Sequence, residues 1–191
     1  SRYHSLRHDG GLEQLHWSTT RSREFDEVLA FAFDHRKQME DIAVDTGKSS
    51  ADIGAFKQLC LQAFRETKVA YQGRGLGILC DGRLGQDALD DASGNEIWIG
   101  RPIEFPASRP LEFEGGPSVM ETLREWPAEH CVKCLTFYHP DDDAPMREEQ
   151  ELQLLLLASA ARATRHELLV EVIPPAHLDR ADGTVVRVME R

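Results

Sequence analysis

Short apolar runs alternate with amphipathic stretches along most of the chain, a pattern that predicts strands each followed by a helix. Five of these runs are short and apolar on both faces, as expected of buried parallel strands. They occupy residues 28–33, 75–80, 96–100, 131–138 and 167–173. This regular alternation favours parallel strands joined by helical crossovers, which is an α/β fold.

The stretches between these runs carry helix signals. We predict helices over residues 50–68, 86–92, 117–126, 145–164 and 184–191. Ser49 or Ser50 can cap the first of them, and Pro145 suits the first turn of the fourth. The apolar spacing also predicts which residues the two long helices bury. These are Ile53, Phe56, Leu59, Cys60 and Phe64 in the first, and Leu152, Leu155, Leu156, Ser159 and Ala163 in the fourth.

The strand ends favour a TIM (β/α)8 barrel over the alternative, a doubly wound open sheet. Several strands stop in charged groups, and in a barrel the carboxyl ends of the strands converge on the face where active sites lie. A closed barrel takes about 250 residues, whereas this chain has 191. We therefore predict an incomplete barrel of about five βα units over residues 25–191, after a polar tail or linker over residues 1–24.

Composition narrows the partners and the compartment. The 22 basic and 33 acidic residues give a net charge of −11, and so acidic a surface disfavours nucleic acid and anionic membranes as partners. No apolar run reaches the roughly 18 residues of a membrane-spanning helix, and the first residues lack the apolar core of a signal peptide. Four cysteines in a chain of this length do not form a disulfide framework. We expect a cytoplasmic protein, and a fragment of a longer one because Met is not its first residue.

Charged and polar groups follow or interrupt the predicted strands, and these are the candidate site residues. Lys133 and Glu171 each interrupt a strand that is apolar on both sides. Because burying a lone charge is costly, such residues either pair within the sheet or face a functional pocket, and both interpretations stay open. The other candidates lie near strand ends: Asp34, His35, Arg36, Asp81, Arg83, Arg101, Glu104 and His139.

Other motifs favour structural explanations. Cys131 and Cys134 lie three residues apart in a strand, so their side chains point to opposite faces and cannot share a metal ion. Residues 73–77 (GRGLG) precede a strand instead of following one, unlike a dinucleotide-binding loop. Residues 141–143 (DDD) precede a helix with Pro in its first turn, and we interpret them as its cap.

Several longer motifs, taken in order, carry a family resemblance. They are 31–36 (FAFDHR), 79–83 (LCDGR), 100–104 (GRPIE), 108–113 (SRPLEF), 132–142 (VKCLTFYHPDD) and 167–174 (ELLVEVIP). Together they resemble the C-terminal, aldolase-like domain of unknown function (DUF2090) that is fused to 5-dehydro-2-deoxygluconokinase in bacterial myo-inositol catabolism. The similarity runs from about residue 15 to the end of the chain.

The resemblance implies a TIM barrel related to class I aldolases such as tagatose-bisphosphate aldolase. The implied reaction is retro-aldol cleavage of 6-phospho-5-dehydro-2-deoxygluconate into dihydroxyacetone phosphate and malonate semialdehyde. It implies catalytic roles for Asp34, Lys133 and Glu171, and a Schiff-base lysine on a sixth strand that this sequence does not reach. Arginines can hold a carboxylate bidentately, so we expect Arg36, Arg83 and Arg101 to bind substrate. His35, Asp81, Glu104 and His139 complete the predicted substrate-binding set.

No cofactor or metal is expected for this chemistry. The expected partners are a phosphorylated keto-sugar acid as substrate, the fused ribokinase-like domain of the parent, and a second copy in a homo-oligomer. The kinase motif itself lies outside these residues. One alternative is a non-catalytic domain that regulates or assembles the fused kinase. Another is metal-dependent aldol chemistry that uses His35, His139 and the aspartates.

Overall fold

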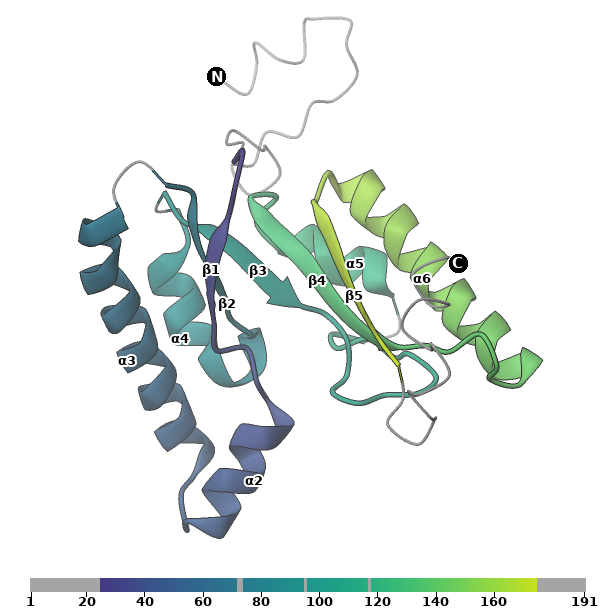
Figure 1. Ribbon diagram of the computed structural model, residues 1–191, viewed down its shortest axis with the longest axis horizontal. Coiled ribbons are helices and arrows are strands. Elements are labelled where there is room, and N and C mark those ends of the chain that lie inside the picture. Colours follow the sequence, from purple (N-terminus) through teal and green to yellow (C-terminus); the bar gives the residue numbers. More distant parts are fainter. Residues whose placement is uncertain (1–24, 72–73, 95, 117, 175–191) are drawn as a thin grey trace, which may run out of the picture.

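The computed structural model describes residues 25–71, 74–94, 96–116 and 118–174. The predicted tail over residues 1–24 and the predicted helix over residues 184–191 lie outside these ranges. Figure 1 shows one curled sheet whose helices lie along its outer side. The concave side of the sheet carries no helix among the described residues.

The sheet confirms the parallel α/β prediction and has the strand order β1-β2-β3-β4-β5. Every neighbouring pair of strands is parallel. This sequential order rules out the doubly wound alternative for the described residues, because that sheet reverses its order at a switch point. The result is a curled half-barrel of strands Leu29–Ala32 (β1), Leu76–Leu79 (β2), Trp98–Pro102 (β3), His130–Phe137 (β4) and Leu168–Ile173 (β5).

Four of the five predicted helices lie within the described residues and are present, and the structure adds one more. The helix α3 (Ser50–Lys68) starts at the predicted serine, since the Ser49 side chain accepts a hydrogen bond from the Asp52 amide and Asp52 accepts one from the Ser49 amide. The added helix, α2 (Lys37–Asp45), was not predicted, although Met39, Ile42 and Ala43 stand at helical spacing on it. The others are α4 (Gly82–Ala92), α5 (Val119–Glu125) and α6 (Ala144–Thr164), with a short 3-10 helix at Val69–Tyr71.

Two apolar clusters fill the space between the sheet and its helices. One packs α3 and α4 against β2 and the first part of β3, with Leu61, Ile78 and Leu89 almost fully buried. The other packs α5 and α6 against β4, around Val132 and Leu157. Even-numbered residues of β4 therefore face the helices, and odd-numbered residues face the concave side.

The buried stripes of the two long helices differ from those predicted. In α3, Phe56 is 48% exposed and Leu59 is 62% exposed, while Lys57 and Leu61 are buried. The buried face of α3 differs from the predicted one because it includes Lys57, whose side chain forms a buried ion pair with Asp81. In α6, Leu152, Leu155 and Leu156 are exposed, and Ser159 and Ala163 are also exposed. The face that packs against β4 instead consists of Gln150, Leu157, Ala160, Ala161 and Thr164.

These helices do not include a candidate for crossing the bilayer: within the described residues, none combines the necessary length with sufficient apolarity.

Candidate functional site

Three of the predicted residues meet on the concave face of the sheet. Lys133 lies in β4, and its Nζ is 3.1 Å from Oδ2 of Asp34 and 3.2 Å from Oε2 of Glu171. Asp34 follows β1 by two residues and Glu171 lies in β5. Since β1 and β5 are the outermost strands, it is the curl of the sheet that allows one lysine to contact carboxylates from both. We call Asp34, Lys133 and Glu171 the concave-face trio.

The electrostatics of the trio keep Lys133 cationic. Burial by itself would lower the pKa of Lys133, but the neighbouring carboxylates of Asp34, Glu104 and Glu171 outweigh it, and the pKa is raised. Asp34 and Lys133 are buried, whereas the Glu171 side chain is about half exposed. Chemically, the trio offers a fixed positive charge for an oxyanion, and one carboxylate accessible enough to exchange protons with a ligand.

Arg36 and Glu104 form a buried pair beside the trio. Arg36 donates to the Glu104 backbone oxygen at 2.5 Å and also to its carboxylate, and the Leu135 amide donates to the other Glu104 oxygen at 3.1 Å. Burial raises the pKa of Glu104 even though Arg36 opposes the change. Arg36 also lies 3.2 Å from Glu114, so two glutamates engage its guanidinium. This pair connects the segment after β1 to the segment after β3 and, through the Leu135 amide, to β4 beside the trio.

Asp81 lies on the helix side of the sheet, where it makes a structural pair. Its side chain is fully buried against Lys57 of α3, and its second oxygen caps α4 by accepting from the Leu84 amide at 2.7 Å. Lys57 also donates to the His35 backbone oxygen at 3.0 Å, while the His35 side chain is exposed. The sequence analysis missed Lys57, although the signal was present: a lysine four residues after Ile53 and four before Leu61, on the buried side of an amphipathic helix.

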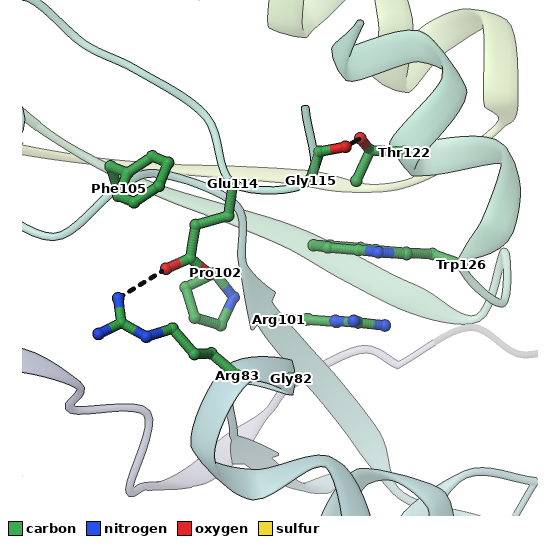
Figure 2. A pocket seen from close by; sticks show the side chains of 9 residues that line it. All are labelled: Gly82, Arg83, Arg101, Pro102, Phe105, Glu114, Gly115, Thr122 and Trp126. Atoms are coloured by element: carbon green, nitrogen blue, oxygen red, sulfur yellow. Dashed lines mark hydrogen bonds and ion pairs between the residues drawn. The ribbon is translucent and has the colours of Figure 1, made fainter. Parts of the chain in front are cut away.

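Arg101 also points to the helix side. Its register partner in β4 is Val132, which lies in the apolar cluster under α6. The guanidinium stacks on Trp126 at 4.1 Å from the ring centroid, and burial lowers its pKa. Figure 2 shows the two planar groups edge-on, one above the other. Arg83 lies near the same opening and pairs with Glu40 and Glu114. The sheet therefore separates Arg101 from the concave-face trio.

His139 is buried in the loop after β4. Its Nδ1 accepts a hydrogen bond from the Asp141 amide at 3.0 Å, and Asp142 accepts one from the His139 amide at 3.2 Å. Asp143 is the N-cap residue of α6, but its side chain makes no capping hydrogen bond. The predicted side-chain cap over residues 141–143 is therefore wrong in detail, because Asp142 instead holds the loop and pairs with Arg109.

The sequence left metal-dependent aldol chemistry open as an alternative and argued against a metal ion shared by Cys131 and Cys134. In the part of the chain that the structure describes, no three His, Cys, Asp or Glu side chains are arranged to hold a metal ion. Cys134 lies in the cluster under α6, and Cys131, three residues away in the same strand, faces the other side, as predicted. Burial raises the pKa of Cys134 to about 12, so its thiol stays protonated at neutral pH.

Comparison with protein families identifies a match over the whole chain. A family model described as "Uncharacterized protein conserved in bacteria (DUF2090)" matches residues 1–191, the whole chain. No curated protein matches it.

Proposed function

The chain belongs to the DUF2090 family, and from the concave-face trio we propose that it is an aldolase-like lyase domain of myo-inositol catabolism. The proposed reaction is retro-aldol cleavage of 6-phospho-5-dehydro-2-deoxygluconate to dihydroxyacetone phosphate and malonate semialdehyde. The proposed parent is a 5-dehydro-2-deoxygluconokinase that carries this domain beside a ribokinase-like domain.

One observation carries the proposal: a buried lysine in β4 bridges carboxylates from β1 and β5 on the concave face. In α/β barrels, active sites are built from strand ends at the carboxyl face. A lysine held between two carboxylates in a sheet can also be a structural ion pair. Against that, Glu171 is half exposed and is thus within reach of a ligand, which a purely internal pair does not need.

The proposed chemistry assigns a role to each member of the trio. In the retro-aldol step a base removes the proton from the substrate hydroxyl at C3, and the C3–C4 bond breaks to leave an aldehyde at C3. The electrons of that bond form a C4=C5 double bond, the negative charge moves to the C5 oxygen, and protonation at C4 then gives dihydroxyacetone phosphate. The exposed carboxylate of Glu171 is suited to accept the C3 hydroxyl proton. Charged Lys133 is suited to stabilise negative charge that develops on a substrate oxygen. Asp34 holds the Lys133 ammonium in position. Because Lys133 is a cation, it does not act as the amine nucleophile in this proposal.

The test is release of dihydroxyacetone phosphate by the full-length parent protein, followed with a coupled glycerol-phosphate dehydrogenase. Substitutions Lys133→Met and Glu171→Gln are each expected to lower kcat by about 10² or more, a typical cost of losing a charge-stabilising or acid–base group. Lys48→Met, at an exposed lysine just before α3, is the matched control. A wild-type parent that releases no dihydroxyacetone phosphate contradicts the proposal, as do trio variants with unchanged kcat.

A second candidate function, regulation or assembly of the fused kinase, has its own supporting observation. The outer face of α6 exposes Leu152, Leu155 and Leu156, a stripe of a kind that serves as a contact surface. If this role is the right one, Leu155→Lys in the parent changes kinase activity or assembly, while Lys133→Met changes neither. The opposite result favours the lyase.

A further inference from the structure

A cleft of about 610 Å³ lies outside the trio, on the helix side of β3. It opens between the start of α4 and the end of α5, and Figure 2 shows the side chains around it. The residues that matter most for its chemistry are Arg83, Arg101, Phe105, Glu114, Thr122 and Trp126. Its volume falls within the range of small-molecule sites, which run from roughly 300 to 1,000 Å³.

Arg101 is the unusual feature of this cleft. Within the described residues its guanidinium has no hydrogen bond or ion pair, and its contact is the stack on Trp126. Stacking holds the guanidinium plane while leaving its N–H edge free to donate. An unpaired arginine is conspicuous in a chain of net charge −11, where acidic partners are abundant. Arg101 also borders a second hollow of about 480 Å³, so it has space on both sides.

The same cleft holds a carboxylate that can accept a further hydrogen bond. Glu114 Oε1 forms ion pairs with Arg36 at 3.2 Å and with Arg83 at 3.5 Å, and neither contact has good hydrogen-bond geometry. This oxygen can therefore also accept a well-aligned hydrogen bond from a ligand or water in the cavity that it lines. A ligand that satisfies both groups carries an anionic end for Arg101 and a hydroxyl or amine for Glu114.

We propose that this cleft is a second binding site, separate from the trio, for a small hydroxylated anion of the sugar-phosphate or sugar-acid class. Arg101 donates two parallel N–H groups to the phosphate or carboxylate, as arginine does in bidentate pairs. Glu114 accepts from a hydroxyl of the ligand body, which lies against Phe105 and Trp126. This site does not depend on the lyase proposal.

The cleft and the trio are connected by ion pairs. Glu114 contacts Arg36, Arg36 is bonded to Glu104, and Glu104 contributes to the raised pKa of Lys133. A ligand that engages Glu114 therefore alters the contacts of Arg36, and through Glu104 the field at Lys133. This chain of contacts makes the cleft suitable for an effector as well as for a passive ligand.

The test measures binding of glucose 6-phosphate to the full chain by calorimetry, with glucose and inorganic phosphate as partial ligands. Wild type is expected to bind glucose 6-phosphate better than either partial ligand. Arg101→Met is expected to weaken binding by about tenfold or more, the scale of a lost charge-assisted hydrogen bond. Glu114→Gln is expected to lower the preference for glucose 6-phosphate over inorganic phosphate, because phosphate has no hydroxyl on a carbon body.

Gly82→Ala is a gentler variant in case Arg101→Met does not fold. A Cβ at Gly82 would collide with the Arg101 guanidinium, which is the movable end of a long side chain. Alanine is also a better helix former than glycine, so α4 should persist while Arg101 is displaced. Weakened glucose 6-phosphate binding with an unchanged melting temperature is the expected result.

A control variant defines failure. Arg124→Met removes an exposed arginine of α5 and should leave binding unchanged. The proposal is overturned if wild type binds no glucose 6-phosphate, or if Arg124→Met weakens binding as much as Arg101→Met. It is also overturned if Lys133→Met abolishes binding while the Arg101 and Gly82 variants retain it, because the anion then sits at the trio. None of these outcomes depends on lyase turnover.

Discussion

At the scale of single residues, two lysines of this chain have opposite surroundings and opposite expected roles. Lys133 faces the concave side and forms ion pairs with the buried carboxylate of Asp34 and the half-exposed carboxylate of Glu171. Lys57 is fully buried on the helix side and pairs with a carboxylate that also caps a helix. The first arrangement suits a ligand-facing site, and the second suits a structural support.

The Lys57–Asp81 pair should be costly to break from one side. Lys57→Met leaves Asp81 buried without its cation, and we expect a loss of about 3–5 kcal/mol in the free energy of unfolding. Lys48→Met, at an exposed position just before the same helix, should change it by less than about 0.5 kcal/mol. Urea unfolding followed by circular dichroism measures both. Equal values for the two variants would show that the buried pair does not contribute as described.

Lys133 should contribute stability that depends on pH in the alkaline range. Its pKa is raised in the folded chain above the ordinary value of 10.5. The folded state therefore holds this proton more tightly than the unfolded state, and the stabilisation is fully present below the unfolded pKa and lost as pH rises through the folded one. Above pH 10.5, wild type should lose unfolding free energy with rising pH more steeply than Lys133→Met. Parallel slopes for the two proteins would contradict the raised pKa.

At the scale of elements, the strands could be predicted from sequence, and the helix faces only in part. In α3, Ile53, Cys60 and Phe64 are buried as predicted, but the α6 face was wrong. Each strand is a short apolar run that stops at a charged or polar residue or at proline, so its place shows in the pattern. The α6 sequence has apolar residues on two faces, and periodicity alone selected the leucine-rich one. The face that packs on β4 is instead the one with small residues and Gln150, which accepts from the Leu111 amide and donates to the Phe137 oxygen at 2.7 Å.

The same reasoning explains which site residues could be found. Lys133 and Glu171 stand out because each is a charge inside an apolar strand, and the register that pairs Glu171 with Leu135 then places both on one face. Arg101 and Asp81 carry equally strong sequence signals but point to the helix side. Which face they occupy depends on strand register and on the partners Trp126 and Lys57, and these are tertiary facts that no local pattern contains.

The face assignment of α6 is open to a direct test. Leu155 is 67% exposed and Leu157 is fully buried, although they are two residues apart. Leu155→Lys should change the free energy of unfolding by less than about 0.5 kcal/mol, whereas Leu157→Ala should cost about 2–5 kcal/mol by opening a cavity under β4. The reverse ranking in thermal or urea unfolding would restore the leucine stripe as the packed face.

At the scale of the whole molecule, the two edge strands of the half-barrel, β1 and β5, expose apolar side chains. Strand β1 is exposed along its whole length, with Phe31 at 45%, and β5 exposes Leu169, Val170 and Val172. Unpaired edge strands with apolar side chains are templates for association. The sequential strand order leaves β1 and β5 at the two ends of the sheet, where a barrel would be closed by further strands.

We therefore expect the 191-residue chain, expressed alone, to self-associate through these edges. Sedimentation velocity at micromolar concentrations should show species larger than 21.6 kDa. The double substitution Phe31→Lys with Val172→Lys should shift the distribution toward the monomer, because charges on edge strands oppose strand addition. Val44→Lys, at an exposed position of α2 away from both edges, should leave it unchanged. A wild-type chain that sediments as a stable monomer would contradict this prediction, because the exposed edge strands would then be stable without a partner. Evidence for a closed barrel in the parent would in that case have to come from the further strands of the parent.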